Sequence, residues 1–378
     1  MNSPSYYKFL NLIIRVIPIR LRSIVRRYIP LTKWDQYHRI LNNPYADEPP
    51  ELIIEGSKYT IGIIYEYMQY HKVNIAACRE MGVSYKLLDI SKDDWIEIVQ
   101  RSECDAFLVW PSSSLSIWKE MFDDRLKILE EDLGKIVYPS YQETWLYENK
   151  RRVRDWLKAK GILHPQTWIF YDFEEALAFA RNASLPLVYK TNIGASHSGV
   201  WILRKRSEVV NIVRRSFSRG IVSRGHNPFD RQWGVVYLQE YLPNVKEWRI
   251  MRIGNSYFGY RKERVGDFHS GSGAWTWLDP PRELLNLLRE VTEIGGFTSM
   301  DMDVFETNDG NYLVNELQTV FGATTPADML RVNGKSGRYL YDSQSNQWVF
   351  DEGDYSRNMC ANARLDYLIN DILNRAAD

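Results

Sequence analysis

The chain has 378 residues, with 48 Lys and Arg against 48 Asp and Glu, so its formal net charge at pH 7 is zero. This balance excludes a general electrostatic attraction to nucleic acid, and any charge effect must be local. The length is typical of two or three domains. The three cysteines are widely spaced and form neither a disulfide framework nor a zinc motif, which indicates a reduced, cytoplasmic protein.

Residues 1–50 form a basic N-terminal arm, in which eight Lys and Arg within the first 40 residues face a single acid, Asp35. Its apolar segment is interrupted by Arg15 and Pro18 and is shorter than the roughly 20 residues that a membrane-spanning helix needs. Two interpretations stay open. The arm is either a peripheral amphipathic anchor on anionic lipid or a helix packed on the protein body with its cations in solvent.

Residues 51–138 alternate short apolar runs with helical stretches: YTIGIIYEY, VNIAACREMG, SYKLLDI, DDWIEIVQRS and DAFLVW. Strands alternating with helices of this length predict βαβ units around a parallel sheet. The lone Gly62 in the first strand does not make the GxGxxG pattern of a dinucleotide site. We therefore expect an open α/β domain without a dinucleotide.

The following segment predicts a helix over 145–161, with Val153, Trp156 and Leu157 on one face and Gly161 at its end. A strand after Pro165, the helix EEALAFARN and the strand PLVYK come next. Later, KEWRIMRIGNSYFGYRKER is typical of a hairpin that turns at Gly-Asn. After the helix PRELLNLLREV, the strands SMDMDVFE and NYLVNELQ are joined by the turn signal TNDG.

The stretch VYKTNIGASHSGVWIL places Lys190 at the end of an apolar strand and continues into a loop rich in Gly and Ser. Glycine lets backbone N–H groups approach a phosphate closely, and an ammonium group neutralises its charge. The order differs from a Walker A loop, in which lysine follows the glycines and opens a helix. We expect a lid over a triphosphate; the alternative is an ordinary hairpin with a solvated lysine.

Two acids near the C-terminal end predict a metal site. Asp303 and Glu316 lie on adjacent predicted strands, and Gln318 lies two residues after Glu316 and so on the same face. Paired carboxylates repel unless a cation or proton intervenes, and Mg²⁺ prefers carboxylate and carbonyl oxygens. The alternative is one buried acid with a hydrogen-bonded neighbour.

The order of these pieces resembles the ATP-grasp superfamily, in the branch of carboxylate–amine ligases similar to glutathione synthetase, D-alanine–D-alanine ligase and the ribosomal-protein S6 glutamate ligase. The resemblance covers roughly residues 139–375, and KTNIGASHSGV and VNELQTVFG are similar to segments of a bacterial subfamily. It implies an α/β fold, α+β in its C-terminal part. The implied units are the arm (1–50), a pre-ATP-grasp α/β domain (51–138), a first lobe with the phosphate-covering loop (139–235) and a second lobe with the metal site (236–378).

The resemblance also implies roles for single residues. Lysines from two lobes and the loop at 192–199 meet the phosphates, the segment LQEYL receives adenine, and one acid binds ribose. The implied nucleotide-binding residues are Lys150, Lys190, Gly194, Ala195, Ser196, Ser198, Gly199, Gln239, Glu240, Tyr241, Leu242 and Glu247. The implied metal ligands are Asp303, Glu316 and Gln318, holding Mg²⁺ with Mn²⁺ as the alternative, and Arg249 and Arg261 resemble the cations that face phosphate and substrate carboxylate.

Two positions depart from the family pattern. The usual ending is Glu, any residue, Asn, whereas this chain has Glu316, Leu317 and Gln318, which keeps an amide oxygen and shifts it by one methylene. His269 stands where the S6-ligase-like pattern has arginine. His269 is either a proton relay for the incoming amine or a hydrogen-bonding wall. The backbone amides after it, from Ser270 onward, are candidates for stabilising an oxyanion.

The expected function is that of an enzyme, an ATP-dependent ligase that forms an amide between a carboxylate and an amine through an acyl phosphate. The substrates implied are an amino acid, a peptide or a cell-surface polysaccharide precursor, with no nucleic acid. Two alternatives stay open: a kinase on the same scaffold that phosphorylates a hydroxyl, and a catalytically silent nucleotide-binding protein. Monomer and homodimer are both open, and cytoplasmic localisation is expected with or without membrane contact through the arm.

Overall fold

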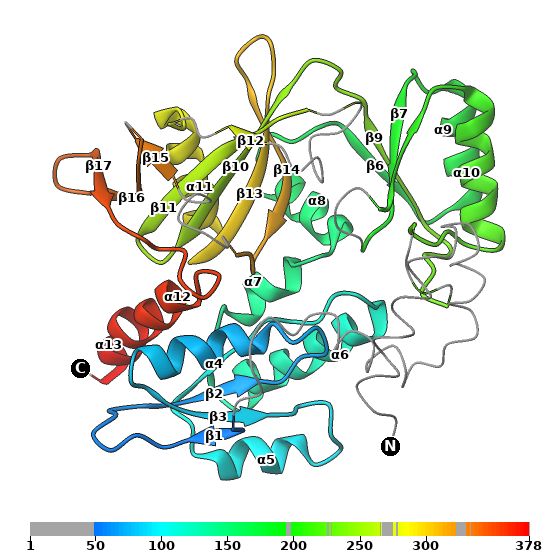
Figure 1. The fold of residues 1–378 in the computed structure, drawn as a ribbon. Helices are drawn as coiled ribbons and strands as arrows, with labels where there is room; N and C mark the ends of the chain where they lie inside the picture. The colour runs from blue at the N-terminus through cyan, green and yellow to red at the C-terminus, as the bar shows by residue number, and fades with distance from the viewer. Residues whose placement is uncertain are drawn as a thin grey trace, which may run out of the picture.

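The structure is a computed structural model that describes residues 49–193, 198–224, 227, 229–264, 266, 275–276, 279–322, 330–332 and 334–377. These residues form three β-sheets with helices packed against them (Figure 1). The predicted basic arm lies almost entirely outside the described residues. Within them, no helix combines the length and the apolar character that crossing a bilayer requires.

The N-terminal unit is a five-stranded sheet in the order β1–β3–β2–β4–β5, parallel except for β1. One apolar core joins one face of the sheet to α4, and another joins the other face to α5 and α6. The central strand is therefore apolar on both sides, as a covered parallel sheet requires. The predicted βαβ arrangement is confirmed. The elements are β1 Glu51–Leu52, β2 Thr60–Ile64, α4 His71–Glu80, β3 Ser84–Leu88, α5 Trp95–Ser102, β4 Ala106–Leu108, α6 Ser116–Lys127, the π-helical turn η1 Ile128–Asp132 and β5 Ile136–Tyr138.

The second unit is a four-stranded antiparallel sheet in the order β6–β9–β7–β8. Helices α9 and α10 lie side by side on one face of this sheet (Figure 1). Their apolar faces meet Leu187, Tyr189 and Leu238 of the strands in one core. The elements are β6 Thr167–Phe170, α9 Phe173–Asn182, β7 Leu187–Lys190, β8 Val200–Leu203, α10 Arg206–Ser218 and β9 Val236–Glu240.

The third unit is an eight-stranded antiparallel sheet, ordered β14–β13–β10–β11–β16–β15, with β12 paired to β11 and β17 to β16. Helices α8 and α11 supply apolar side chains to the core on one face. The predicted hairpin is present, with Ile253 paired to Ser256 across the turn. The elements are β10 Lys246–Ile253, β11 Ser256–Lys262, β12 Trp275–Thr276, α11 Arg282–Gly295, β13 Ser299–Glu306, β14 Tyr312–Gln318, β15 Leu330–Val332, β16 Lys335–Asp342 and β17 Gln347–Glu352.

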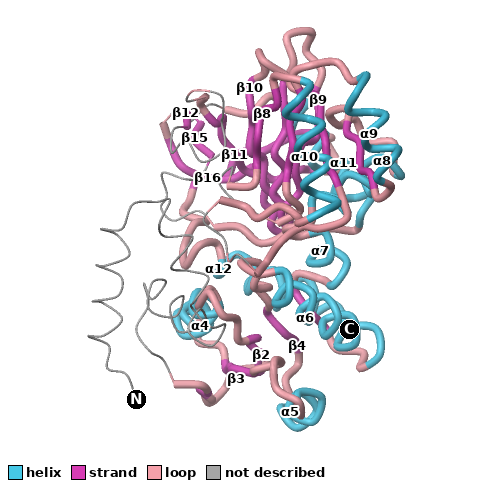
Figure 2. The backbone as a smooth tube through the Cα atoms, turned by 90° about the vertical axis from the view of Figure 1, so that its right-hand side faces the viewer, coloured by secondary structure: helices cyan, strands magenta, loops and turns pink. Residues whose placement is uncertain are grey.

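The single helix expected over 145–161 is two helices, α7 Tyr141–Leu146 and α8 Lys150–Ala159. The side chain of Asn149 accepts a hydrogen bond from the backbone N–H of Arg152 and so caps the N-terminus of α8. The second helix therefore begins just after Asn149. Figure 2 shows α7 between the N-terminal unit and the two antiparallel sheets. The break thus lets α8 turn onto the large sheet.

The sheets also group the chain differently from the expected lobes. Helix α8, expected in the first lobe, packs on the large sheet, because Val153 and Leu157 join its core. Strand β9, expected in the second lobe, completes the four-stranded sheet. The exact domain boundaries stay a prediction.

The C-terminal helices, α12 Ala361–Tyr367, the π-helical turn η3 Leu368–Leu373 and α13 Asn374–Ala377, return to the N-terminal unit. Ala361, Leu365 and Leu368 are fully buried in the same core as Ile61 and Ile63 of β2. Figure 1 shows α12 beside α4. The two ends of the described chain therefore share one apolar core, which the sequence reading did not anticipate.

Candidate active site

One face of the large sheet carries a row of charged side chains. The strand register places Glu247 opposite Lys262, Arg249 opposite Asp303, and Asp303 opposite Glu316. Successive side chains of a strand point to opposite faces, so the intervening Trp248, Met302 and Leu317 enter the apolar core on the other side. The predicted pair of acids therefore lies side by side, as expected from the turn between their strands.

Asp303 is held by two cations. Arg249 donates to both carboxylate oxygens, from Nε and Nη2, each at 3.0 Å, and Lys262 donates to it as well. Burial raises the pKa of Asp303, but Arg249 and Lys262 outweigh burial and hold its pKa below the usual range. Lys262 also lies 2.7 Å from Glu247. The buried Asp303, Lys262 and Glu247 and the half-buried Arg249 thus form one connected network of charges.

Asp301 is the acid of this network whose carboxylate has the fewest hydrogen bonds among the described residues. Arg249 Nε lies 3.0 Å from one of its oxygens, yet within the described part of the chain neither oxygen accepts a hydrogen bond. Burial raises the pKa of Asp301, Arg249 opposes this, and the charge of Asp303 adds to the rise. The pKa of Asp301 is therefore raised, whereas those of Asp303 and Glu316 are lowered, so Asp301 is protonated more easily than either.

The two predicted lysines reach the same place from different elements. Lys150 begins α8 and places Nζ 3.1 Å from Oε1 of Glu316. Lys190 ends β7 and donates to Oδ1 of Asn315 at 2.9 Å. Burial lowers the pKa of Lys190 to about 8; Lys150 acts in the same direction, and Glu316 opposes it. For Lys150, burial lowers the pKa, but Glu316 and Glu148 outweigh it, so its pKa is raised. Both lysines therefore lie beside the paired acids Asp303 and Glu316.

Gln318, the third predicted metal ligand, lies beside Glu316. Its Nε2 donates to Glu316 Oε1 at 2.9 Å, while its Oε1 is buried and has no hydrogen-bond partner among the described residues. Nowhere in the described ranges are three His, Cys, Asp or Glu side chains grouped as around a metal ion. Magnesium at nucleotide sites commonly uses one or two carboxylates, with phosphate and other oxygens completing its shell. Asp303, Glu316 and the orphaned amide oxygen of Gln318 fit that pattern.

The segment expected to receive adenine leads from the four-stranded sheet to the large sheet. Gln239 is buried and donates from Nε2 to Thr167 Oγ1 at 3.1 Å. Glu240 accepts the backbone N–H of Gln166 at 2.7 Å. The half-buried Tyr241 and Leu242 follow β9, and Arg264 donates to the Tyr241 hydroxyl at 3.0 Å.

Glu247, predicted to bind ribose, is 3% exposed and paired with Lys262. In this structure its carboxylate faces the cation network. Its predicted contact with ribose stays a prediction.

Only the ends of the predicted phosphate-covering loop are described. Thr191 donates its backbone N–H to the carbonyl of Gly199 at 2.8 Å. A Cβ at Gly199 would lie 1.7 Å from Thr191 Oγ1, so this close approach requires glycine. The carbonyl of Ser198 accepts from Arg224. Gly194, Ala195 and Ser196 lie outside the described residues, as do the catalytic candidates His269 and Ser270.

Arg261 is not part of the charged face. It pairs with Trp248 in the strand register, and its guanidinium lies 2.9 Å from Glu263. Lys262, the next residue, occupies the position expected for Arg261 because side chains alternate along a strand. Lys262, Asp301 and Asn315 are the members of the site that the sequence reading missed.

No family model matches this chain, and no curated protein matches it. Solved structures do match. A RimK-domain ATP-grasp protein from Sphaerobacter thermophilus shares 15% identity over 82% of this chain and 98% of its own, with a TM-score of 0.51. The N5-carboxyaminoimidazole synthetase of Staphylococcus aureus, complexed with ADP, shares 13% identity over 76% of this chain and 74% of its own, with a TM-score of 0.50.

The biotin carboxylase domain of the Hydrogenobacter thermophilus 2-oxoglutarate carboxylase, solved with MgADP and bicarbonate, shares 16% identity over 69% of this chain and 64% of its own, with a TM-score of 0.50. At these identities the likeness concerns the fold. The fold expected from the sequence is confirmed: the chain has the ATP-grasp fold, preceded by an α/β domain.

Proposed function

We propose that this protein is an ATP-dependent ligase that joins a carboxylate to an amine through an acyl phosphate and releases ADP and phosphate. The observation that carries the proposal is the convergence of Lys150 and Lys190, from separate units of the fold, on the paired acids Asp303 and Glu316. Proteins with this fold have been solved with ADP and with MgADP. Cations beside carboxylates that suit a divalent ion make a site for a metal-bound triphosphate.

The residues of the site divide into two groups. Lys150 and Lys190 are proposed to contact phosphate oxygens, because both ammonium groups are buried where a triphosphate would need neutralising. Asp303, Glu316 and Gln318 would hold Mg²⁺, or Mn²⁺ in its place. When bound, the ion supplies charge neutralisation and orientation for the phosphates. Arg249 and Lys262 keep the Asp303 carboxylate ionised and fix its position.

The proposed reaction has two steps. An oxygen of the substrate carboxylate attacks the γ-phosphorus in line, and the bond to the bridging oxygen breaks, so that ADP leaves with the electron pair. The amine nitrogen then attacks the acyl carbon, loses a proton, and expels phosphate with the electron pair of the C–O bond. Positioning and electrostatic stabilisation provide most of the catalysis in such phosphoryl transfer, so no nucleophilic side chain is needed.

The test is a turnover assay with purified protein, ATP, Mg²⁺ and a panel of amino acids, peptides and sugar acids. A ligase releases ADP and phosphate in stoichiometric amounts only when both a carboxylate and an amine are present. A stable phosphorylated product would instead identify a kinase. Nucleotide binding without turnover on any combination would favour the silent nucleotide-binding protein.

A further inference from the structure

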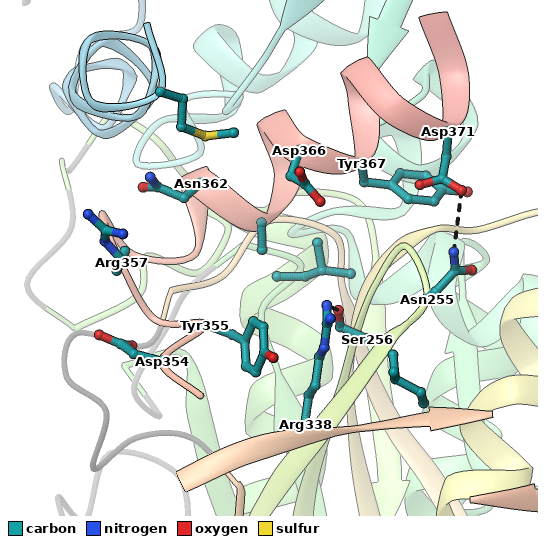
Figure 3. Close-up of a pocket in the computed structure, with 14 residues that line it drawn as sticks. Asn255, Ser256, Arg338, Asp354, Tyr355, Arg357, Asn362, Asp366, Tyr367 and Asp371 are labelled. Atoms are coloured by element: carbon teal, nitrogen blue, oxygen red, sulfur yellow. Dashed lines mark hydrogen bonds between the residues drawn. The ribbon is translucent and has the colours of Figure 1, made fainter. Parts of the chain in front are cut away.

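A cavity lies at the far end of the strands that carry the candidate active site. Its volume is about 480 Å³, and it opens between the β10–β11 hairpin, strand β16 and the C-terminal helices (Figure 3). Arg249 and Lys262 are four and six residues from the hairpin end at Ile253 and Ser256. At about 3.3 Å per residue, the two sites lie roughly 13–20 Å apart along the strands. A ligand in this cavity is therefore separate from the reacting groups.

One wall of the cavity carries the guanidinium of Arg338, which is paired with Asp351. Arg338 extends from β16 toward the C-terminal helices in Figure 3. Its Nε donates to Asp351 and its Nη1 to Ser256, each at 2.9 Å, and its guanidinium lies 4.2 Å from the ring centre of Tyr355. These contacts fix the plane of the guanidinium and leave part of its five N–H groups for a ligand. The remaining donors suit a carboxylate, which arginine binds through two parallel hydrogen bonds.

The facing wall is acidic. Asp366 extends from α12 on the opposite side of the cavity from Arg338, and Asp371 of η3 lies near Asn255 of the hairpin turn (Figure 3). Asp366 accepts from Asn370 at 2.8 Å, and Asp371 from Arg375 at 3.0 Å. Asp371 also accepts from Asn255 at 3.4 Å, and each carboxylate keeps lone pairs beyond these bonds. This wall therefore suits an ammonium group.

The surface between the two charged walls is mainly apolar or aromatic. Ile253, Leu340 and Ala363 line the cavity together with Tyr355 and Tyr367. Arg338 can bind a carboxylate and Asp366 an ammonium group, and apolar surface lies between them. This arrangement suits a zwitterion with an apolar side chain. We propose that this cavity binds an α-amino acid or a short peptide, with its carboxylate on Arg338 and its ammonium group on Asp366.

Occupation of the cavity joins three parts of the fold. The hairpin belongs to the large sheet, the C-terminal helices complete the core of the N-terminal unit, and Met81 at the end of α4 also lines the cavity. The ligand therefore stabilises the folded chain by binding across these parts. This inference does not depend on the proposed ligase activity.

Calorimetric titration of the full chain with L-phenylalanine and with leucyl-phenylalanine, without nucleotide, tests the proposal. Both zwitterions bind, and their N-acetyl and methyl-ester derivatives, which each lack one charge, bind at least tenfold more weakly. Arg338→Met and Asp366→Asn each lower the affinity about 10- to 100-fold. Arg338→Lys keeps part of the affinity because it keeps the charge without the planar fork.

The matched control is Arg289→Met. Arg289 lies on α11, pairs with Glu293 at 2.8 Å and does not line the cavity, so its variant binds like the unmodified chain. The proposal is overturned if neither zwitterion binds the unmodified chain at millimolar concentration, or if the acetylated and esterified derivatives bind equally well. Turnover with ATP plays no part in these measurements, so their failure would leave the ligase proposal standing.

Discussion

Charged side chains are compensated differently at the two ends of the β10–β11 hairpin. At the active-site end, the side chains of Lys262, Glu247 and Asp303 are 9%, 4% and 1% exposed, and Lys262 contacts both acids. At the turn end, Arg338 is 26% exposed and its partner Asp351 is 38% exposed. Buried charges need compensation from each other, whereas exposed ones are compensated by water. The charged groups at the active-site end therefore depend on one another, whereas those at the turn end can exchange bound water for a ligand.

The largest expected effect comes from removing one member of the buried unit. Lys262→Met removes the ammonium group that Glu247 and Asp303 share, and should lower the free energy of unfolding by about 3–5 kcal/mol. Urea unfolding followed by circular dichroism measures this loss. Arg338→Met, at the exposed end, should cost no more than about 1 kcal/mol. Similar losses for the two variants would mean that the two ends do not differ as described.

A second prediction separates catalysis from folding at the buried end. Glu316→Gln removes one ligand charge and should lower metal-dependent turnover about 100-fold or more, since a bound ion contributes several kcal/mol to the transition state. Circular dichroism should show a folded protein. Glu263→Gln is the control, because Glu263 pairs with Arg261 on the opposite face of β11. A Glu316→Gln variant with most of its activity would rule out the proposed metal ligands.

A smaller effect is expected at the lysine that ends β7. Lys190→Ala should weaken ATP binding about tenfold, because it removes one charge-assisted contact with phosphate. Equilibrium titration with an ATP analogue measures the affinity. The exposed Lys246, which pairs with Glu306 at the surface, supplies the control variant Lys246→Ala. Unchanged affinity in Lys190→Ala would place this lysine outside the nucleotide site.

The smallest expected effect is a pH dependence. The pKa of Lys190 is lowered to about 8 by burial, and a lysine carries its charge below its pKa and loses it above. ATP affinity should therefore fall a few-fold as pH rises through about 8, reversing on return to lower pH. Lys190→Arg, which stays charged, should flatten this part of the profile. A flat profile in the unmodified chain, together with unchanged ATP affinity in Lys190→Ala, would show that the charge of Lys190 does not contribute to binding.

Much of the fold follows from local patterns. The βαβ alternation, the Gly-Asn hairpin turn and the TNDG turn are encoded within short segments, and the structure has all three. The turn even fixes which residue of β11 faces the acids. Counting outward from the Ile253–Ser256 pair aligns Glu247 with Lys262 and Arg249 with Tyr260. The expectation for Arg261 missed this signal, since it depended on family resemblance rather than strand register.

Other features have no local signature. Asp301 shares a face with Asp303 by alternation, but its lack of hydrogen-bond partners among the described residues depends on how β10 and β14 pack beside it. Asn315 meets Lys190 only because two sheets approach each other. The return of α12 to α4 joins residues nearly three hundred positions apart, and apolar periodicity says which face of a helix is buried without naming its partner.

That return has a consequence during synthesis. The core around β2 and α4 stays incomplete until Ala361, Leu365 and Leu368 arrive, and these residues leave the ribosome well after those of β2 and α4. The N-terminal unit therefore keeps apolar surface exposed while the residues between α4 and α12 are synthesised. This unit is made first but can complete its core only later. Removal of α12 would therefore destabilise β2 and α4, far from the removed residues in sequence.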